Sequence, residues 1–352
     1  MTADHRFKIA NREIGDGEPA FIIAELSANH NHSFDRAVQL VEEASRAGAD
    51  AVKLQTYTSD TITIDSKRPE FRLGEGTLWS GRSLYDLYGE AYTPWDWQPK
   101  LKTVAEDLGM LCFSSPFDDT AVDFLESISV PAYKIASFEL VDSELLRKVA
   151  ATGKPVIMST GMASLAEIDE AVRTLREAGC TELALLKCTS AYPSLPEDMN
   201  LRTIPHLADA FNVPVGLSDH TLGISVPVAA VALGACIIEK HLTFRRSDGG
   251  PDGAFSLEPE EFRVMVDAVR MAEKSLGVIN YELSEKEVSS RGFRRSLFVV
   301  KEMKAGDVYD KENVRSIRPG NGLPVKDLSR VLGRKASCDI ERGTPLRNDM
   351  IS

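Results

Sequence analysis

Eight short apolar runs alternate with longer segments of helical periodicity along the first 280 residues. The runs are FIIAE (21–25), AVKLQ (51–55), MLCFS (110–114), AYKIA (132–136), PVIMS (155–159), LALLKC (183–188), PVGLS (214–218) and ACIIEK (235–240). Most are too short for helices, and helix-like segments such as FDRAVQLVEEASRAG separate them. Eight strand–helix units over about 250 residues predict an α/β protein with a (β/α)₈ (TIM) barrel.

A doubly wound parallel sheet is the structural alternative. No G-x-G-x-x-G turn follows the first run, which weakens a dinucleotide-binding version of that fold. Beyond the polar, linker-like segment VINYELSEKEVSSRG, short strand-like runs and Gly/Pro turns dominate. We therefore expect a separate small, β-rich domain over residues from about 290 to 352.

The connection between the second and third runs is far longer than the usual βα loop. It contains GTLWSGRSLYDLYGEAYTPWDW, which includes all three tryptophans of the chain. Such a loop predicts either a substrate lid over the barrel mouth or a segment packed against the barrel's side. The sequence leaves both open.

Composition narrows the partners and the compartment. A net charge of −12 argues against nucleic acid or an anionic membrane surface as a partner. No apolar run is long enough to span a membrane, and the first residues lack the apolar core of a signal peptide. The five cysteines show no paired spacing, so we expect reduced thiols in a cytoplasmic protein.

Polar residues stand at the ends of all eight runs, where a barrel gathers its chemistry. Lys53 and Lys134 in an acidic protein indicate a bound anion, although Glu25 could simply form an ion pair with Lys53. Serines recur around the same mouth and are typical of a phosphate or carboxylate site, since hydroxyls and backbone N–H groups supply neutral donors.

His220 and His241 follow neighbouring runs and together predict a shared divalent metal. Two His ligands leave coordination positions open, which indicates a catalytic metal. Arg318, in the run RPGNGL, is by itself typical of a surface turn.

This residue set suits joining a phosphorylated or carboxylated donor to a carbonyl acceptor that a metal polarises. It also suits a metal-dependent aldolase or a hydrolase. A carbohydrate-binding or ice-binding protein built around the small domain is the non-enzyme alternative. Binding alone, however, needs neither paired histidines nor buried lysines.

The motifs AELSANHN, AVKLQTY, SSPFD, MSTGMA, KCTSAYP, GLSDHT, EKHLT and GPDGAFSLEP together resemble the sialic acid synthase family. The RPGNGL region, with GDVYDKENV and LGRKASCDIERGTPL, resembles that family's C-terminal antifreeze-like (SAF) domain. The resemblance implies a synthase barrel at 1–280, a linker at 281–291 and a SAF domain at 292–352. It implies a transferase that condenses phosphoenolpyruvate with an N-acetylated amino sugar. It also implies a domain-swapped homodimer in which the small domain reaches over the partner's barrel.

The resemblance also implies a role for each site residue. Phosphoenolpyruvate would be held by Lys53, Ser115, Lys134, Ser137, Ser159, Ser190 and Ser218. The sugar would contact Gln55, Glu139, Tyr192 and Asp252, and a manganese or magnesium ion would bind His220 and His241. Glu25 would lie beside the reacting carbons and Arg318 would come from the partner's SAF domain; with Lys53 and Lys134 they form the implied catalytic set.

Within the family, three features resemble the branch that makes pseudaminic acid. They are AELSANHN in place of a glycine-containing first motif, the insertion SGRSLYDLYGEAYTPWDW, and FSLEP after GPDG. The implied acceptor is 2,4-diacetamido-2,4,6-trideoxy-L-altrose, and the implied product is a nine-carbon 2-keto acid. Synthesis of N-acetylneuraminic or legionaminic acid is the alternative within the family.

Overall fold

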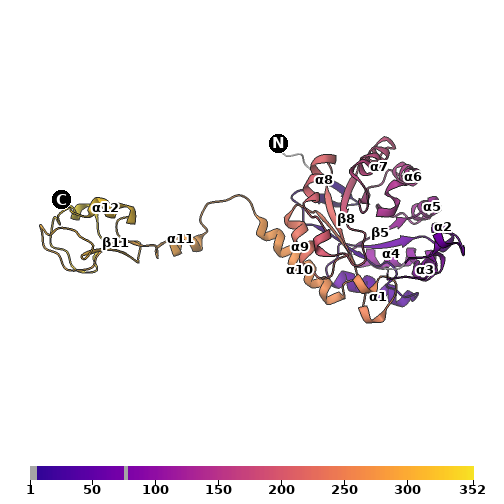
Figure 1. Ribbon diagram of the computed structural model, residues 1–352, viewed down its shortest axis with the longest axis horizontal. Helices are drawn as coiled ribbons and strands as arrows, with labels where there is room; N and C mark the ends of the chain where they lie inside the picture. The colour runs from indigo at the N-terminus through magenta and orange to yellow at the C-terminus, as the bar shows by residue number, and fades with distance from the viewer. Residues whose placement is uncertain (1–5, 75–77) are drawn as a thin grey trace. The chain divides into compact units, whose positions relative to one another are not determined.

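The computed structural model describes residues 6–74 and 78–352. The chain divides into two compact units, Met1–Gly277 and Val278–Ser352 (Figure 1). Among the described helices, none is long and apolar enough to cross a membrane.

The first unit is a closed barrel of eight parallel strands, as the alternating runs predicted. Every strand overlaps the run expected for it. The strands are β3 (Phe21–Glu25), β4 (Ala51–Thr56), β5 (Leu111–Pro116), β6 (Tyr133–Ile135), β7 (Val156–Ser159), β8 (Leu183–Cys188), β9 (Val215–Asp219) and β10 (Ile237–His241). Strand β10 pairs with both β3 and β9, and this pairing closes the barrel.

Helices connect the strands and surround the barrel (Figure 1). They are α1 (Phe34–Arg46), α4 (Gln98–Asp107), α5 (Asp119–Ser127), α6 (Ser143–Ala151), α7 (Leu165–Glu177), α8 (Thr203–Phe211), α9 (Ser225–Ala232) and α10 (Pro259–Leu276). Several begin at a side-chain cap that satisfies free backbone N–H groups. Ser164, for example, accepts from the N–H of Glu167, whose carboxylate accepts in return from the N–H of Ser164.

Apolar side chains fill the barrel interior towards the N-terminal ends of the strands. Ile23, Phe113, Ile157 and other inward residues form one buried cluster with Phe7 and Ile14. These last two belong to the hairpin β1 (Arg6–Ile9) and β2 (Arg12–Gly15), which therefore closes the N-terminal end of the barrel.

Gly216 on β9 occupies an inward position that accepts no side chain. A Cβ there would lie 2.4 Å from the carbonyl oxygen of Ile237 and 2.7 Å from Leu186 Cδ2. The barrel interior is therefore closely packed at this level, so an active site belongs at the C-terminal ends of the strands, as in other TIM barrels.

The long insertion is held to the barrel at several points. It contains α2 (Ser59–Ile62) and α3 (Leu84–Ala91). Trp95 donates to the carbonyl oxygen of Tyr57 and stacks against Phe124, and Trp97 contacts His30 and Phe34. Both tryptophans therefore pack against the barrel's outer layer.

The second unit contains α11 (Glu285–Arg291), β11 (Ser296–Val299), β12 (Val314–Ile317) and α12 (Leu328–Val331). Strands β11 and β12 pair antiparallel around a small core that includes Leu297, Tyr309 and Leu346. Much of the rest is irregular, in keeping with its many Gly and Pro turns.

Candidate active site

Four buried charges form the centre of the barrel mouth. The Nζ of Lys53 lies 2.5 Å from Glu25 Oε2 and 3.6 Å from Glu239 Oε1. The Nζ of Lys134 lies 3.9 Å from the same Glu239 oxygen. All four side chains come from inward positions at strand ends, and all are shielded from water. The ion pair considered from sequence, Glu25 with Lys53, is therefore present, but as one part of a four-charge cluster.

Burial and charge pull the pKa values of this cluster in different directions. Burial raises the pKa of Glu25, although the positive charge of Lys53 opposes it. Burial also lowers the pKa of Lys134 to about 8. Burial would raise the pKa of Glu239 too, but Lys134 and Lys53 outweigh it, and that pKa is lowered. The site thus holds one carboxyl that takes up a proton readily and one that stays ionised.

Serine hydroxyls surround the two lysines. The Nζ of Lys134 donates to Ser159 Oγ at 2.6 Å, and the Nζ of Lys53 donates to Ser115 Oγ at 3.4 Å. Ser218 Oγ donates to Glu239 Oε1 at 3.0 Å. These serines lie on β7, β5 and β9, so three strands contribute hydroxyls to the same mouth.

A second group of hydroxyls comes from the loops. The N–H of Gly161 donates to Ser137 Oγ at 3.1 Å. A Cβ on Gly161 would lie 2.7 Å from Ser137 Oγ and 2.2 Å from Ser190 Oγ. Only glycine leaves the backbone open between these hydroxyls, as an anion site built from neutral donors requires. We call Ser137, Gly161 and Ser190 the hydroxyl cluster.

The two histidines lie side by side against the rings of Tyr192 and Phe255, which we call the aromatic wall. The ring centroids of His220 and His241 are 5.3 Å apart. Tyr192 contacts His220 with centroids 4.6 Å apart, and Phe255 contacts His241 with centroids 5.0 Å apart. The structure therefore brings together the pair for which the sequence predicted a metal.

The chemistry of this pair fits a divalent cation. Nδ1 of His220 lies 3.2 Å from the carbonyl oxygen of Thr189, so a proton on Nδ1 leaves a lone pair on the other ring nitrogen. Nδ1 of His241 is buried with no hydrogen-bond partner among the described residues. Burial and the neighbouring His220 hold the pKa of His241 well below its ordinary value, which favours the neutral, ligating form.

No third ligand completes the pair. Among residues 6–74 and 78–352, no group of three or more His, Cys, Asp and Glu side chains could hold a metal. A cation bound by the two imidazoles would keep its remaining positions for water and substrate, as a catalytic metal does.

The residues predicted to contact the sugar are distributed around the same mouth, since they lie on or follow the alternate strands β4, β6, β8 and β10: Gln55, Glu139, Tyr192 and Asp252. Gln55 Nε2 donates to Ser27 Oγ at 3.0 Å and to Glu25 Oε1 at 3.4 Å, and Ser27 Oγ donates to Asp252. Burial raises the pKa of Glu139 to about 7, and one of its carboxylate oxygens has no partner among the described residues. These positions thus offer several groups able to bind hydroxyl or amide groups.

Trp79 of the insertion lies at the mouth. Its Nε1 donates to the carbonyl oxygen of Pro251 at 2.9 Å, and its ring lies 6.0 Å from that of Tyr192. One tryptophan of the insertion therefore lies beside Tyr192 at the mouth, and the other two pack outside the barrel; the substrate lid stays a prediction.

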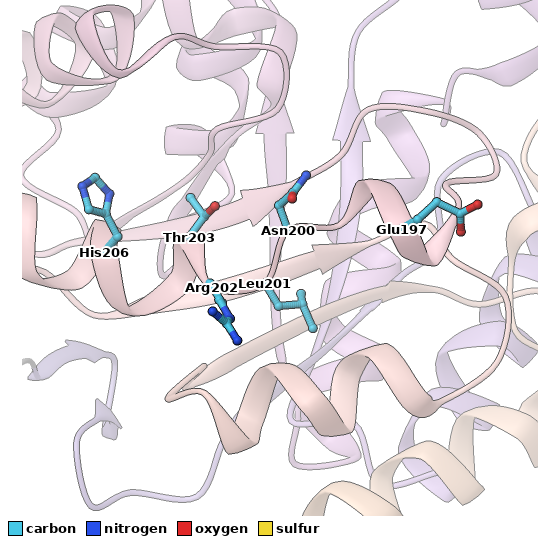
Figure 2. A pocket seen from close by; sticks show the side chains of 6 residues that line it. All are labelled: Glu197, Asn200, Leu201, Arg202, Thr203 and His206. Atoms are coloured by element: carbon cyan, nitrogen blue, oxygen red, sulfur yellow. The ribbon is translucent and has the colours of Figure 1, made fainter.

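Two features lie elsewhere. Arg318 is exposed in the second unit, after β12. A surface hollow lies at the start of α8 (Figure 2), and its lining residues are Glu197, Asn200, Leu201, Arg202, Thr203 and His206. None of these six belongs to the predicted site.

The sequence reasoning missed three contributors. Glu239 was available from strand periodicity, because it lies two residues before His241 on the same face. Ser27 and Gly161 lie in loops, where no periodicity identifies them. The same alternation turns Lys187, Asp219 and Lys240 away from the barrel interior, although they also stand at strand ends.

Together, the closed barrel and the polar residues at its mouth define the arrangement of an enzyme whose active site lies at the C-terminal ends of the strands. Two family models match the chain: NeuB family over residues 40–281 and SAF domain over residues 294–352. The chain therefore belongs to the NeuB family, as the sequence motifs predicted.

Named relatives agree with this assignment. The chain is 47% identical to a pseudaminic acid synthase of Campylobacter jejuni, over 93% of this chain and 95% of the relative. It is 36% identical to an N,N'-diacetyllegionaminic acid synthase of Legionella pneumophila, over 96% and 98%. Among solved structures, an N-acetylneuraminic acid (sialic acid) synthetase of Leptospira borgpetersenii in complex with citrate matches with a TM-score of 0.73 at 33% identity. That match covers 82% of this chain and 95% of the other.

Proposed function

We propose that this chain is a pseudaminic acid synthase. It condenses phosphoenolpyruvate with 2,4-diacetamido-2,4,6-trideoxy-L-altrose to a nine-carbon 2-keto sugar acid and phosphate. The observation that carries the proposal is the mouth itself, where two buried lysines, two buried carboxylates and two adjacent histidines converge. The identity to the Campylobacter synthase favours this sugar over those of the legionaminic and neuraminic branches.

Phosphoenolpyruvate binds between the two lysines and the hydroxyls around them. Lys53 and Lys134 supply positive charge where little water competes, so each contact with the anion is stronger than at a surface. Ser115, Ser159 and Ser218 act from the strands, and the hydroxyl cluster of Ser137, Gly161 and Ser190 acts from the loops. Glu239 stays ionised and keeps both lysines protonated and in place.

His220 and His241 would hold a manganese or magnesium ion, and that ion would supply Lewis-acid polarisation of the sugar's carbonyl group. The sugar itself contacts Gln55, Glu139, Tyr192 and Asp252. The apolar rings of Trp79 and Phe255 suit an acceptor that lacks its 6-hydroxyl group and carries a second acetamido group.

Glu25 is the general base of the proposed reaction. C3 of phosphoenolpyruvate forms a bond to the aldehyde carbon. The aldehyde C=O π bond breaks, its oxygen takes up a proton to become a hydroxyl, and positive charge develops at C2. Water adds at C2 and gives its proton to Glu25, whose raised pKa suits a general base. The hemiketal then loses phosphate by C–O cleavage, and Lys53 and Lys134 stabilise the departing charge.

We also propose a domain-swapped homodimer in which the barrel at 1–280 receives Arg318 from a partner's SAF domain at 292–352, with 281–291 as the linker. Exposed apolar side chains in the loops around the barrel mouth support a covering partner: Phe138, Met162, Leu165, Leu195 and Leu222 are each more than half exposed. Ile279, just before the linker, and Tyr281, its first residue, are almost completely exposed. The free cysteines fit a reducing cytoplasm.

Phosphoenolpyruvate labelled with ¹⁸O at its bridging oxygen tests the reaction class. With manganese and the altrose acceptor, C–O cleavage transfers the label to inorganic phosphate, and mass spectrometry of the phosphate detects it. Label retained in the sugar product would contradict C–O cleavage. Absence of any acceptor-dependent phosphate would favour a metal-dependent aldolase.

A further inference from the structure

Asp219 and Lys240 form a buried ion pair that the proposed reaction does not use. They are direct partners across β9 and β10, and Lys240 Nζ lies 2.5 Å from Asp219 Oδ2. Both side chains are fully shielded from solvent. They face away from the mouth, because Ser218 and Glu239 beside them face inward.

The pair is bonded to the residue that follows His220. Asp219 Oδ1 accepts from the backbone N–H of Thr221 at 3.0 Å and from Thr221 Oγ1 at 2.8 Å. The Nζ of Lys240 donates to the carbonyl oxygen of Thr221. His220 therefore lies between two residues fixed by this pair, and His241 directly follows Lys240.

The apolar surroundings of the Asp219–Lys240 pair make burial of its two charges costly in free energy. Leu217 and Ile238 precede it on the same outward faces, and Leu242 follows it; all three belong to the apolar layer between strands and helices. Charges in such a layer are often replaceable by apolar residues without loss of stability, so stability alone is a weak reason for them. A geometric task at the adjacent residues is the stronger reason.

We propose that the Asp219–Lys240 pair is a positioning element that holds His220 and His241 at the separation at which they share one cation. Lys240 links the end of β10 to the backbone just after His220, so the two histidines cannot move apart independently. Groups behind metal ligands orient them in this way. The inference rests on the metal site of the proposed function and adds the groups that shape it.

The test uses Mn²⁺ alone and the double variant Asp219→Asn/Lys240→Met. Asn keeps an acceptor for Thr221, and the double change leaves no unpaired buried charge, so the fold is retained while the link to β10 is lost. The matched control is Asp50→Asn/Arg270→Met, which removes a 3.1 Å ion pair outside the proposed site. Mn²⁺ affinity is measured from the electron paramagnetic resonance signal of free Mn²⁺. Metal-free phosphoenolpyruvate binding and the Tm are measured alongside it.

The expected result is Mn²⁺ affinity about tenfold to a hundredfold weaker in the Asp219→Asn/Lys240→Met variant and unchanged in the control. Phosphoenolpyruvate binding without metal stays as in the wild type for both. Unchanged Mn²⁺ affinity in the first variant, or an equal loss in both variants, overturns the inference alone. A wild-type chain that binds no Mn²⁺, or binds it equally after His220→Ala, overturns the proposed metal site and the inference with it.

Discussion

Glu25 and Lys53 are direct partners across β3 and β4, and their side chains meet at 2.5 Å in the barrel mouth. Lys53 also approaches Glu239, while Glu25 accepts from the backbone N–H of Ser27. Lys53 thus lies beside two carboxylates whose pKa values shift in opposite directions: that of Glu25 is raised and that of Glu239 is lowered. In the proposed reaction, this difference lets Glu25 take up a proton while Glu239 keeps its negative charge.

Glu25→Gln is expected to lower turnover at least about a hundredfold, because the general base is lost while the acceptor for Ser27 remains. Phosphoenolpyruvate binding should change only a few-fold. Phosphate release and calorimetric binding measure the two effects. Glu273→Gln, which alters a carboxylate bonded to Ala20 and Arg270, is the control and should keep normal turnover. Near-normal turnover of Glu25→Gln would remove Glu25 from the reaction.

Phosphoenolpyruvate affinity is expected to fall as the pH rises through about 8, where Lys134 loses its proton. The affinity falls because a neutral Lys134 no longer attracts the anion. The lowered pKa of Lys134 also affects stability, because the folded chain releases this proton at lower pH than the unfolded chain does. Burying Lys134 therefore costs stability below about pH 8, and this cost disappears as the pH rises towards the unfolded value.

Calorimetric titration of metal-free protein with phosphoenolpyruvate, from about pH 7 to about pH 9, measures this dependence. Lys134→Met should bind weakly and without the pH dependence. Lys53→Met, which removes the lysine whose pKa is raised, should bind weakly but keep it. A wild-type affinity that stays constant across the range would show that Lys134 does not contact the anion.

Gly161→Ala is expected to weaken phosphoenolpyruvate binding by at least about tenfold, since its Cβ would occupy the space between the hydroxyls of Ser137 and Ser190. Gly292→Ala is the matched control, because a Cβ there meets its nearest neighbour at an ordinary 3.5 Å. Binding as tight in Gly161→Ala as in the control would place the anion outside the hydroxyl cluster.

Trp79→Ala is expected to raise KM for the sugar about tenfold with little change in phosphoenolpyruvate binding, because Trp79 lies beside Tyr192 of the aromatic wall. Trp95→Ala should lower the Tm and leave KM unchanged, since Trp95 packs against Phe124 on the outside. Steady-state kinetics and thermal unfolding separate the two. An equal KM in both variants would rule out a role for Trp79 in acceptor binding.

The strands were predictable because eight short apolar runs separated by helical segments have few compact solutions. Lys53 and Gln55 were predictable as a pair because residues two apart share a face of a strand. The same rule, applied to His241, predicts that Glu239 faces the barrel interior and that Lys240, between them, faces outward. Which residues line the mouth from the strands is therefore accessible from sequence once periodicity is used throughout.

The loop residues were less accessible. Ser137, Gly161 and Ser190 come from three different loops, and only the closed barrel brings them together. The contacts of His30 and His32 likewise depend on the three-dimensional fold. His30 hydrogen-bonds to Thr93 and His32 to the backbone carbonyl oxygen of Gly89, so the two histidines attach the first loop to the insertion. Such contacts depend on tertiary geometry, which local propensity does not encode.

Acceptor-dependent phosphate release tests the central claim most directly. The chain is incubated with phosphoenolpyruvate and manganese, and 2,4-diacetamido-2,4,6-trideoxy-L-altrose and N-acetylmannosamine are offered in parallel, with the product mass recorded. We predict phosphate release and a nine-carbon 2-keto acid with the altrose alone. Release with N-acetylmannosamine alone would contradict the pseudaminic assignment and identify a neuraminic acid synthase on the same scaffold.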